Sequence, residues 1–227
     1  MKNKNLLFLY ALLCSTEIVA EYFEVELLRY LIKPTLMIAL SVYFYLETES
    51  DYTSFAKKIQ AALVFSWGGD VFLMFPSCFL PGLVSFLIAH IFYILAFYEN
   101  IKSKPQQRSF SLTFLFALPF LFFSTILFSA VFPYLNEMVI PVAVYTIILT
   151  SMGISAALRK GSVYSESYTN VLLGAIIFMS SDSTIAINKF IYNGELPYAR
   201  IIIMVTYLLA QYLIVKGCLN LQASKKS

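Results

Sequence analysis

Eight stretches of about 20 mostly apolar residues constrain the fold of this chain more than any other feature of its sequence. A helix needs about 20 such residues to cross a hydrocarbon core of about 30 Å. Only 13% of the residues are charged, against about 25% in an ordinary soluble domain. The sequence therefore predicts an all-α fold, a polytopic integral membrane helix bundle that forms one domain over residues 1–227. The eight predicted transmembrane helices are 6–20, 27–46, 55–75, 80–98, 110–132, 138–158, 168–190 and 199–219.

The first apolar stretch is predicted to remain in the protein as a membrane span. Lys2 and Lys4 precede it, as in a signal peptide, but acidic residues follow it and no A-x-A cleavage site is present. Two of these acidic residues, Glu17 and Glu21, are expected to form a solvated rim at the outer end of the span.

The distribution of Lys and Arg predicts the orientation, because short loops rich in these residues stay in the cytoplasm. One side of the bundle collects 12 of the 16 Lys and Arg residues, and the net charge of +3 needs no nucleic-acid partner. Both termini are therefore expected in the cytoplasm, and the absence of an address signal favours the cell membrane. The 12 residues are Lys2, Lys4, Lys57, Lys58, Lys102, Lys104, Arg108, Arg159, Lys160, Lys216, Lys225 and Lys226; the other four are Arg29, Lys33, Lys189 and Arg200.

Cysteine and histidine usage limits the metal chemistry that this chain can perform. Three cysteines are isolated from one another, and a single histidine cannot build a histidine-rich zinc site. We expect no metal and no organic cofactor.

A few polar residues lie deep inside the predicted spans. Asp70 is about 18 Å from the inner boundary and Asp182 about 21 Å, while His90 and Tyr207 lie about 14 and 15 Å below the outer one. Because an ionised carboxylate at the bilayer centre costs about 2.5–3.5 kcal/mol, the two aspartates are expected to face a shared, partly hydrated cavity. The small residues next to them, Gly68, Gly69, Ser180 and Ser181, would let helices approach closely. The alternative is that each aspartate is only a structural hydrogen-bonding residue.

Two halves of the chain share a weak pattern. A G-G-D run ends at Asp70 and an S-S-D run ends at Asp182, and a Leu-Pro pair follows each. This predicts two parallel four-helix repeats, about 1–109 and 110–227, with one aspartate from each.

The ordered motifs of the chain resemble the YhhN family of membrane proteins, whose characterised members are lysoplasmalogenases. The motifs cover most of the chain and are KPTLMIAL (33–40), GGDVFLMF (68–75), LPGLVSFLIAHIFYILAFY (80–98), GAIIFMSSD (174–182) and YLLAQYLI (207–214). The resemblance implies hydrolysis of the vinyl-ether bond of lysoplasmalogens, which releases a fatty aldehyde and glycerophosphoethanolamine or glycerophosphocholine. It also implies the site residues Lys33, Asp70, His90, Asp182, Tyr207 and Gln211.

Vinyl-ether hydrolysis needs a carboxylic acid that protonates carbon and a carboxylate that stabilises the resulting cation, by analogy with glycosidases. Asp70 and Asp182 are the expected pair, in either assignment, with His90 as a third catalytic residue. The expected substrate-binding residues are Lys33, Tyr93, Tyr207, Gln211 and Arg200. The expected partners are a vinyl-ether lysophospholipid and membrane lipids.

Paired intramembrane carboxylates are also typical of transporters. A small proton-coupled or lipid transporter is therefore the alternative function, and a non-catalytic lipid-binding protein is a third possibility.

Overall fold

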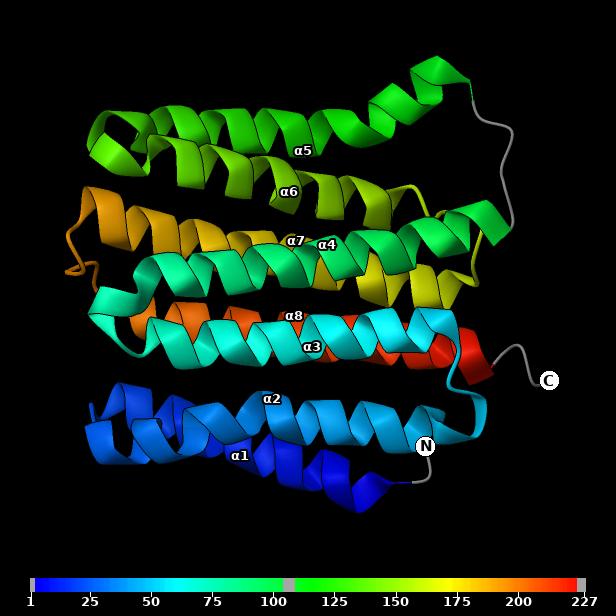
Figure 1. The fold of residues 1–227 in the computed structure, drawn as a ribbon, viewed down its shortest axis with the longest axis horizontal. Coiled ribbons are helices and arrows are strands. Elements are labelled where there is room, and N and C mark those ends of the chain that lie inside the picture. The colour runs from blue at the N-terminus through cyan, green and yellow to red at the C-terminus, as the bar shows by residue number, and fades with distance from the viewer. Residues whose placement is uncertain (1–2, 104–108, 224–227) are drawn as a thin grey trace. The chain divides into compact units, whose positions relative to one another are not determined.

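A computed structural model describes residues 3–103 and 109–223, and this part of the chain is helical (Figure 1). Eight long helices occur in it, and each overlaps one of the predicted spans. Their bounds are α1 Lys4–Tyr22, α2 Glu26–Thr48, α3 Ser54–Leu73, α4 Phe79–Ser103, α5 Phe110–Val131, α6 Val139–Ala157, α7 Ser165–Ala186 and α8 Ala199–Ala223. Short helical turns follow some of them: Glu49–Asp51, Pro76–Cys78, Phe132–Tyr134, Asn136–Met138 and the π-helical Ile187–Ile191.

Seven of the eight helices in the described residues are long and apolar enough to cross a membrane. The exception is α3, in which every 18-residue window contains Lys57, Lys58 and Asp70. The all-helical membrane class is therefore confirmed. The count of eight spans and the cytoplasmic termini stay predictions, and five of the charges that orient the chain lie outside the described residues: Lys2, Lys104, Arg108, Lys225 and Lys226.

The chain divides into two compact units, unit 1 (Met1–Ala96) and unit 2 (Phe97–Ser227), and the boundary falls inside α4. Each unit contains one of the two aspartates. The predicted half-repeats, 1–109 and 110–227, stay a prediction.

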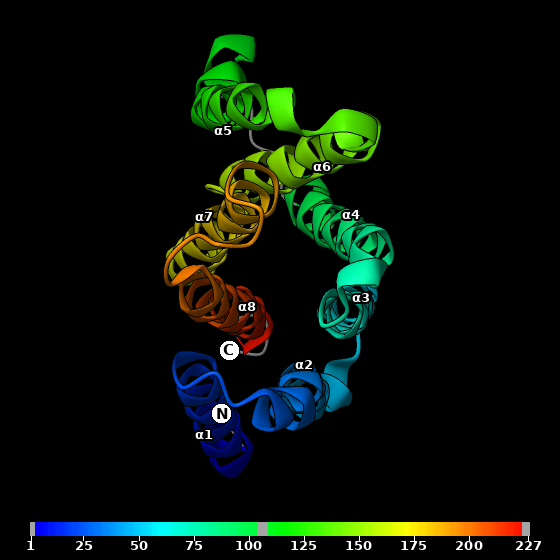
Figure 2. The same cartoon turned by 90° about the vertical axis from the view of Figure 1, so that its left-hand side faces the viewer.

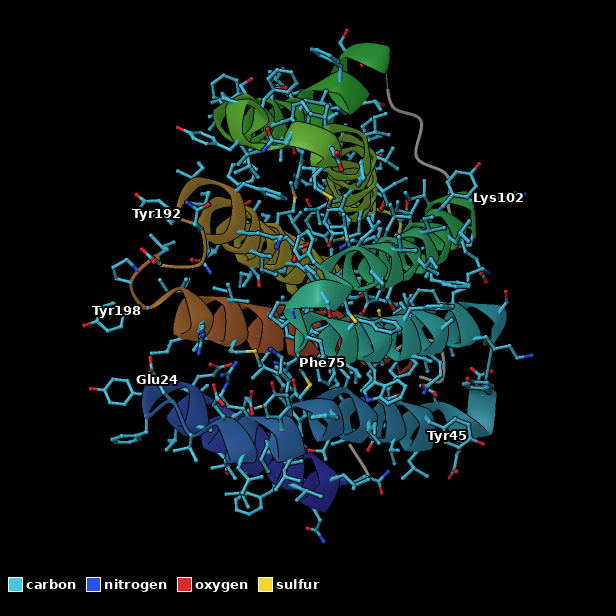
Figure 3. The ribbon with its side chains drawn as sticks, turned by 60° about the vertical axis from the view of Figure 1, so that its left-hand side comes forward. Glu24, Tyr45, Phe75, Lys102, Tyr192 and Tyr198 are labelled. Carbon is cyan, nitrogen blue, oxygen red and sulfur yellow. The ribbon has the colours of Figure 1, made fainter. Side chains whose placement is uncertain are left out.

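In unit 1, α1 and α2 form an antiparallel pair joined by a tight turn (Figure 1). Glu24, labelled in Figure 3, closes this turn with a left-handed φ of 53°. Helix α3 packs against α2. The Trp67 indole N–H on α3 donates a hydrogen bond to the carbonyl oxygen of Pro34 on α2 at 2.9 Å. Pro34 lies inside α2, where its missing N–H and its ring interrupt the regular hydrogen-bond pattern.

Glycines bring α3 and α4 into close contact next to Asp70. A Cβ atom on Gly69 would lie 2.4 Å from the Phe86 ring, and one on Gly68 would lie 2.7 Å from the Ser85 hydroxyl oxygen. That hydroxyl donates to the carbonyl oxygen of Phe65 at 2.6 Å. The predicted role of Gly68 and Gly69 in close helix approach is confirmed, because a Cβ at either position would force the Ser85 or Phe86 side chain to move.

In unit 2, α5 packs on α6, α6 on α7 and α7 on α8 (Figure 2). The backbones of α7 and α8 approach closely at two glycines. A Cβ on Gly174 would lie 2.9 Å from the carbonyl oxygen of Ala210, and one on Gly217 would lie 2.9 Å from that of Ser167. Small residues thus allow the tight helix packing that membrane interfaces use.

Arg159, just beyond the C-terminal end of α6, is fully buried, although the charge pattern placed it in a loop. Its Nε donates to Asn100 Oδ1 at 3.0 Å and one terminal nitrogen donates to Ser167 Oγ at 2.9 Å. The guanidinium also lies 5.2 Å from the Phe97 ring centroid. Burial lowers the pKa of Arg159 to about 10, so the side chain remains charged at neutral pH. The residue therefore ties the end of α4 to the start of α7.

Candidate active site

In unit 1, the buried side chains of Asp70, His90 and Tyr93 come from two neighbouring helices. Asp70 lies three residues before the end of α3, while His90 and Tyr93 are one turn apart on α4 and fully buried. The close α3–α4 contact at Gly69 and Phe86 immediately precedes Asp70 on one helix and precedes His90 by one turn on the other. Asp70 and His90 therefore flank the same helix–helix contact, one on each helix.

Tyr10, on α1, also belongs to this buried region of unit 1. No sequence motif predicted a role for it. Its hydroxyl is hydrogen-bonded to Cys14 and interacts electrostatically with Asp70 and Tyr93. Tyr10 is one of 16 tyrosines, so only a structure could select it.

The predicted solvated rim on α1 is wrong, because Glu17 and Glu21 are both buried. The buried face of α1 consists of Tyr10, Glu17, Ala20 and Glu21, so this helix turns its polar side inward and its apolar side outward. Glu21 forms an ion pair with Arg29 at 2.9 Å, and Glu17 interacts electrostatically with Lys33. In lipid this arrangement is favourable, because hydrocarbon solvates the apolar face.

In unit 2, Asp182 accepts a hydrogen bond from the Tyr145 hydroxyl at 2.5 Å, from α6 to α7. The bond is buried, and the π-helical segment Ile187–Ile191 begins five residues after Asp182. Such segments are frequent at functional sites. Tyr145 is a residue that sequence reasoning missed.

The two serines before Asp182 behave differently from each other. Ser181 is buried and donates to the carbonyl oxygen of Ile203 on α8 at 3.1 Å. Ser180 is exposed and donates to Ile176 in its own helix at 3.1 Å, so its predicted part in helix approach is wrong.

Tyr207 and Gln211 share the buried face of α8, as their spacing of four residues predicts. The Tyr207 ring packs edge-on against Phe178 of α7, with 5.6 Å between centroids. Arg200 is exposed at the start of the same helix. Tyr207 and Gln211 are therefore buried in the same unit as Asp182, whereas Arg200 is exposed.

Asp70, His90 and Tyr93 are thus buried in unit 1, where Lys33 lies on α2, and Asp182, Tyr207 and Gln211 are buried in unit 2. Their roles as site residues stay predictions. The pairing of Asp70 with Asp182 stays a prediction. Among the described residues no group of three or more His, Cys, Asp and Glu side chains is placed to hold a metal ion.

Comparison with known proteins gives a consistent result. The sequence model of the YhhN family matches residues 28–218. The human protein named lysoplasmalogenase TMEM86B is 34% identical over 168 residues, which are 73% of this chain and 65% of the human protein. The mouse protein of the same name is 34% identical over 163 residues, 71% of this chain and 63% of that protein. Human lysoplasmalogenase TMEM86A is 34% identical over 164 residues, 70% of this chain and 64% of that protein.

The matched part of this chain spans just under two thirds of the length of these relatives. No solved protein structure matches the chain.

Proposed function

Because the chain belongs to the YhhN family, we propose that it is a membrane hydrolase that cleaves the vinyl-ether bond of lysoplasmalogens. The products are a fatty aldehyde and glycerophosphoethanolamine or glycerophosphocholine. The name lysoplasmalogenase, which its relatives carry, supports this activity. The names of these relatives give no support to the transporter alternative.

The observation that carries the proposal is that each unit buries one aspartate within its apolar helices. A carboxyl group in such a position costs free energy unless it is used or paired. Two carboxyl groups are also what acid-catalysed hydrolysis of a vinyl ether needs.

The reaction proceeds in three steps. An acid transfers a proton to the carbon β to the ether oxygen, which leaves an oxocarbenium-like cation. Water adds to this cation, loses a proton to a carboxylate and forms a hemiacetal. The hemiacetal collapses to the aldehyde and the free glycerol hydroxyl, so one water molecule is consumed for each bond cleaved.

Asp182 suits the carboxylate role, because the Tyr145 hydroxyl donates to it and a donor stabilises negative charge on the acceptor. Asp70 then acts as the acid. His90, one turn beyond the α3–α4 contact, holds the water or shares the proton.

The remaining residues bind the substrate. Lys33 and Arg200 attract the lipid phosphate, since both are cations near the predicted outer surface. Tyr93, Tyr207 and Gln211 orient the glycerol and the start of the chain. The tail lies among apolar side chains.

The whole chain forms one domain with eight spans in the cell membrane, with α3 as the eighth span and both termini cytoplasmic. Two features account for the three charges of α3. Lys57 and Lys58 lie near its N-terminal end, on the cytoplasmic side, and Asp70 is catalytic. The two four-helix repeats supply one aspartate each.

Aldehyde release by the purified protein from a synthetic lysoplasmalogen tests this proposal. Asp70→Asn and Asp182→Asn should each lower the rate by about 10²–10⁴-fold, the usual contribution of a general acid or base. Asp51→Asn, in the turn after α2, is the matched control and should retain activity. A saturated-ether lysolipid should release nothing.

Near wild-type turnover by a folded Asp70→Asn or Asp182→Asn protein would exclude the paired mechanism. Absence of aldehyde from folded wild-type protein would exclude the hydrolase.

A further inference from the structure

In unit 1, the two helices on either side of the α1–α2 turn carry two pairs of opposite charges. Each pair has a glutamate on α1 and a basic residue on α2. Glu17 and Glu21 are four residues apart on α1, and Arg29 and Lys33 are four apart on α2, so each pair shares a helix face. The helices are antiparallel, which sets Glu21 level with Arg29 and Glu17 level with Lys33. The pair nearer the turn is a closed ion pair, with 2.9 Å between Arg29 Nε and Glu21 Oε2. The second pair, Glu17 and Lys33, interacts electrostatically. In the described part of the chain no ion pair within 4.0 Å joins these two residues, so we call them the open pair.

Glu17 is the unusual member of this group. It is 0% exposed, and neither carboxylate oxygen has a hydrogen-bond partner among the described residues. An ionised carboxylate can accept about four hydrogen bonds, and buried polar atoms in proteins are almost always satisfied. The open acceptors next to Lys33 therefore suit a ligand that brings its own N–H donors.

The open pair is adjacent to the segment that carries Asp70. Pro34, the residue after Lys33, accepts the hydrogen bond from Trp67, and Trp67 precedes Asp70 by about one helical turn. The rings of Tyr30 on α2 and Phe75 after α3 also contact, with 6.1 Å between centroids. The N-terminal part of α2 therefore lies beside the C-terminal part of α3. Lys33 is in this part of α2, near the turn of α3 that leads to Asp70.

We propose that Glu17 and Lys33 bind the two charges of a phosphoethanolamine head group, the ammonium on Glu17 and the phosphate on Lys33. This rests on the proposed lysolipid substrate. The ethanolamine ammonium has three N–H donors for the Glu17 oxygens, whereas the quaternary nitrogen of choline has none. Glu17 is thus the residue that selects ethanolamine over choline lysolipids.

Binding of saturated-ether lysolipids, which cannot be hydrolysed in this way, tests the proposal on the full-length protein in detergent. Trp67 is the only tryptophan in the chain, and its fluorescence reports binding next to Lys33. Wild-type protein should bind the ethanolamine lysolipid at least fivefold more tightly than the choline lysolipid. Across the mono-, di- and trimethylated head groups the affinity should fall as N–H donors are removed, with the largest drop at the last methyl.

Glu17→Gln should bring the two affinities to within about twofold, chiefly by weakening ethanolamine binding. Glu21→Gln, the matched control from the closed pair, should retain the preference. Glu17→Asp provides a second variant and should retain a reduced preference for ethanolamine.

Equal binding of all head groups by wild-type protein would overturn the inference. So would an unchanged preference in Glu17→Gln, or an equal loss of preference in Glu17→Gln and Glu21→Gln, because the effect would then be structural. Aldehyde release is measured separately with the vinyl-ether lysolipids. A protein with the head-group preference and no release contradicts the proposed hydrolase alone, and release without preference contradicts this inference alone.

Discussion

At the scale of single residues, the Tyr145 hydroxyl distinguishes the environment of Asp182. It donates to the carboxylate at 2.5 Å inside unit 2, and a charge-assisted hydrogen bond of this kind is stronger than a neutral one. Asp70 lies instead beside the α3–α4 contact and in electrostatic range of Tyr10. Different surroundings allow two carboxyl groups to take different parts in one reaction.

Tyr145→Phe tests the assigned role of Asp182. Removing the hydroxyl should lower kcat about 10- to 100-fold and change KM little, because the lost hydrogen bond stabilises charge during the reaction rather than substrate binding. Tyr134→Phe, an exposed tyrosine before α6, is the control. Initial rates of aldehyde release measure both, and an unchanged kcat would remove Tyr145 from the mechanism.

Loss of the buried Arg159 guanidinium should lower the stability of unit 2. Arg159→Lys retains the charge but cannot reproduce the bonds to both Asn100 and Ser167, so it should lower the free energy of unfolding by about 1–3 kcal/mol. Arg200→Lys, at an exposed site, should be neutral. Thermal unfolding followed by the loss of helical circular dichroism compares the three proteins.

The difference between wild-type and Arg159→Lys should be constant between about pH 6 and 9. The pKa of Arg159 is lowered to about 10, so its cost of burial is fully present below that value and decreases only as pH rises through it. A stability difference that changes between pH 6 and 9 would show that another group titrates with it.

At the scale of elements, the α3–α4 contact shows how packing positions a catalytic group. Gly69 lies against the Phe86 ring with no room for a side chain, and Asp70 is the next residue. Any displacement of α3 at this point therefore also moves the carboxyl group.

Gly69→Ala should therefore lower both stability and turnover, the latter by at least tenfold, because α3 must separate from α4 or Phe86 must move. Adding Phe86→Leu should restore part of both, since the smaller side chain makes room for the new methyl group. Val64→Ala, on the exposed face of α3, is the control. Turnover and melting temperature are measured together, and no recovery in the double variant would mean that the contact is not the cause.

Helix α1 illustrates a limit of reading elements from sequence. Its residues Glu17 and Glu21 look like a solvated rim, because charged residues near a span end usually reach water. They are buried since Arg29 and Lys33, at the same four-residue spacing, lie on the helix that packs against them. The sequence shows the matching four-residue spacing. It does not show that these two helix faces pack against each other.

At the scale of the whole molecule, the proposed eight spans require that α3 crosses the membrane. Glu24, Lys102 and Tyr198 are exposed and are labelled in Figure 3. Glu24 follows α1, Lys102 lies in the last turn of α4, and Tyr198 lies between α7 and α8. Single cysteines at these positions, in a protein with Cys14, Cys78 and Cys218 replaced, report the side on which each loop lies.

With eight spans, an impermeant maleimide added to intact cells should label the cysteines at positions 24 and 198 and not the one at 102. The reason is that Lys102 then follows an even number of crossings from a cytoplasmic N-terminus. Labelling at position 102 would show that α3 does not cross. Labelling after cell lysis is the control for reactivity.

The sequence by itself determined the membrane class, the position of every long helix in the described residues, and the family. These properties depend on apolar length and local motifs, because a helix in lipid satisfies its own backbone hydrogen bonds within one continuous segment. The predicted Asp70, His90, Tyr93, Asp182, Tyr207 and Gln211 are all buried, since an intramembrane polar residue is expected to face the protein interior.

Only the tertiary structure decided which other residues join them. The bond from Tyr145 to Asp182, the burial of Glu17 and the burial of Arg159 each depend on contacts with another helix. A single sequence records the spacing of residues along one helix but not which face meets which neighbour. Side-chain partners between helices are therefore set by packing, and these partners distinguish a charge used in a site from one that only reaches water.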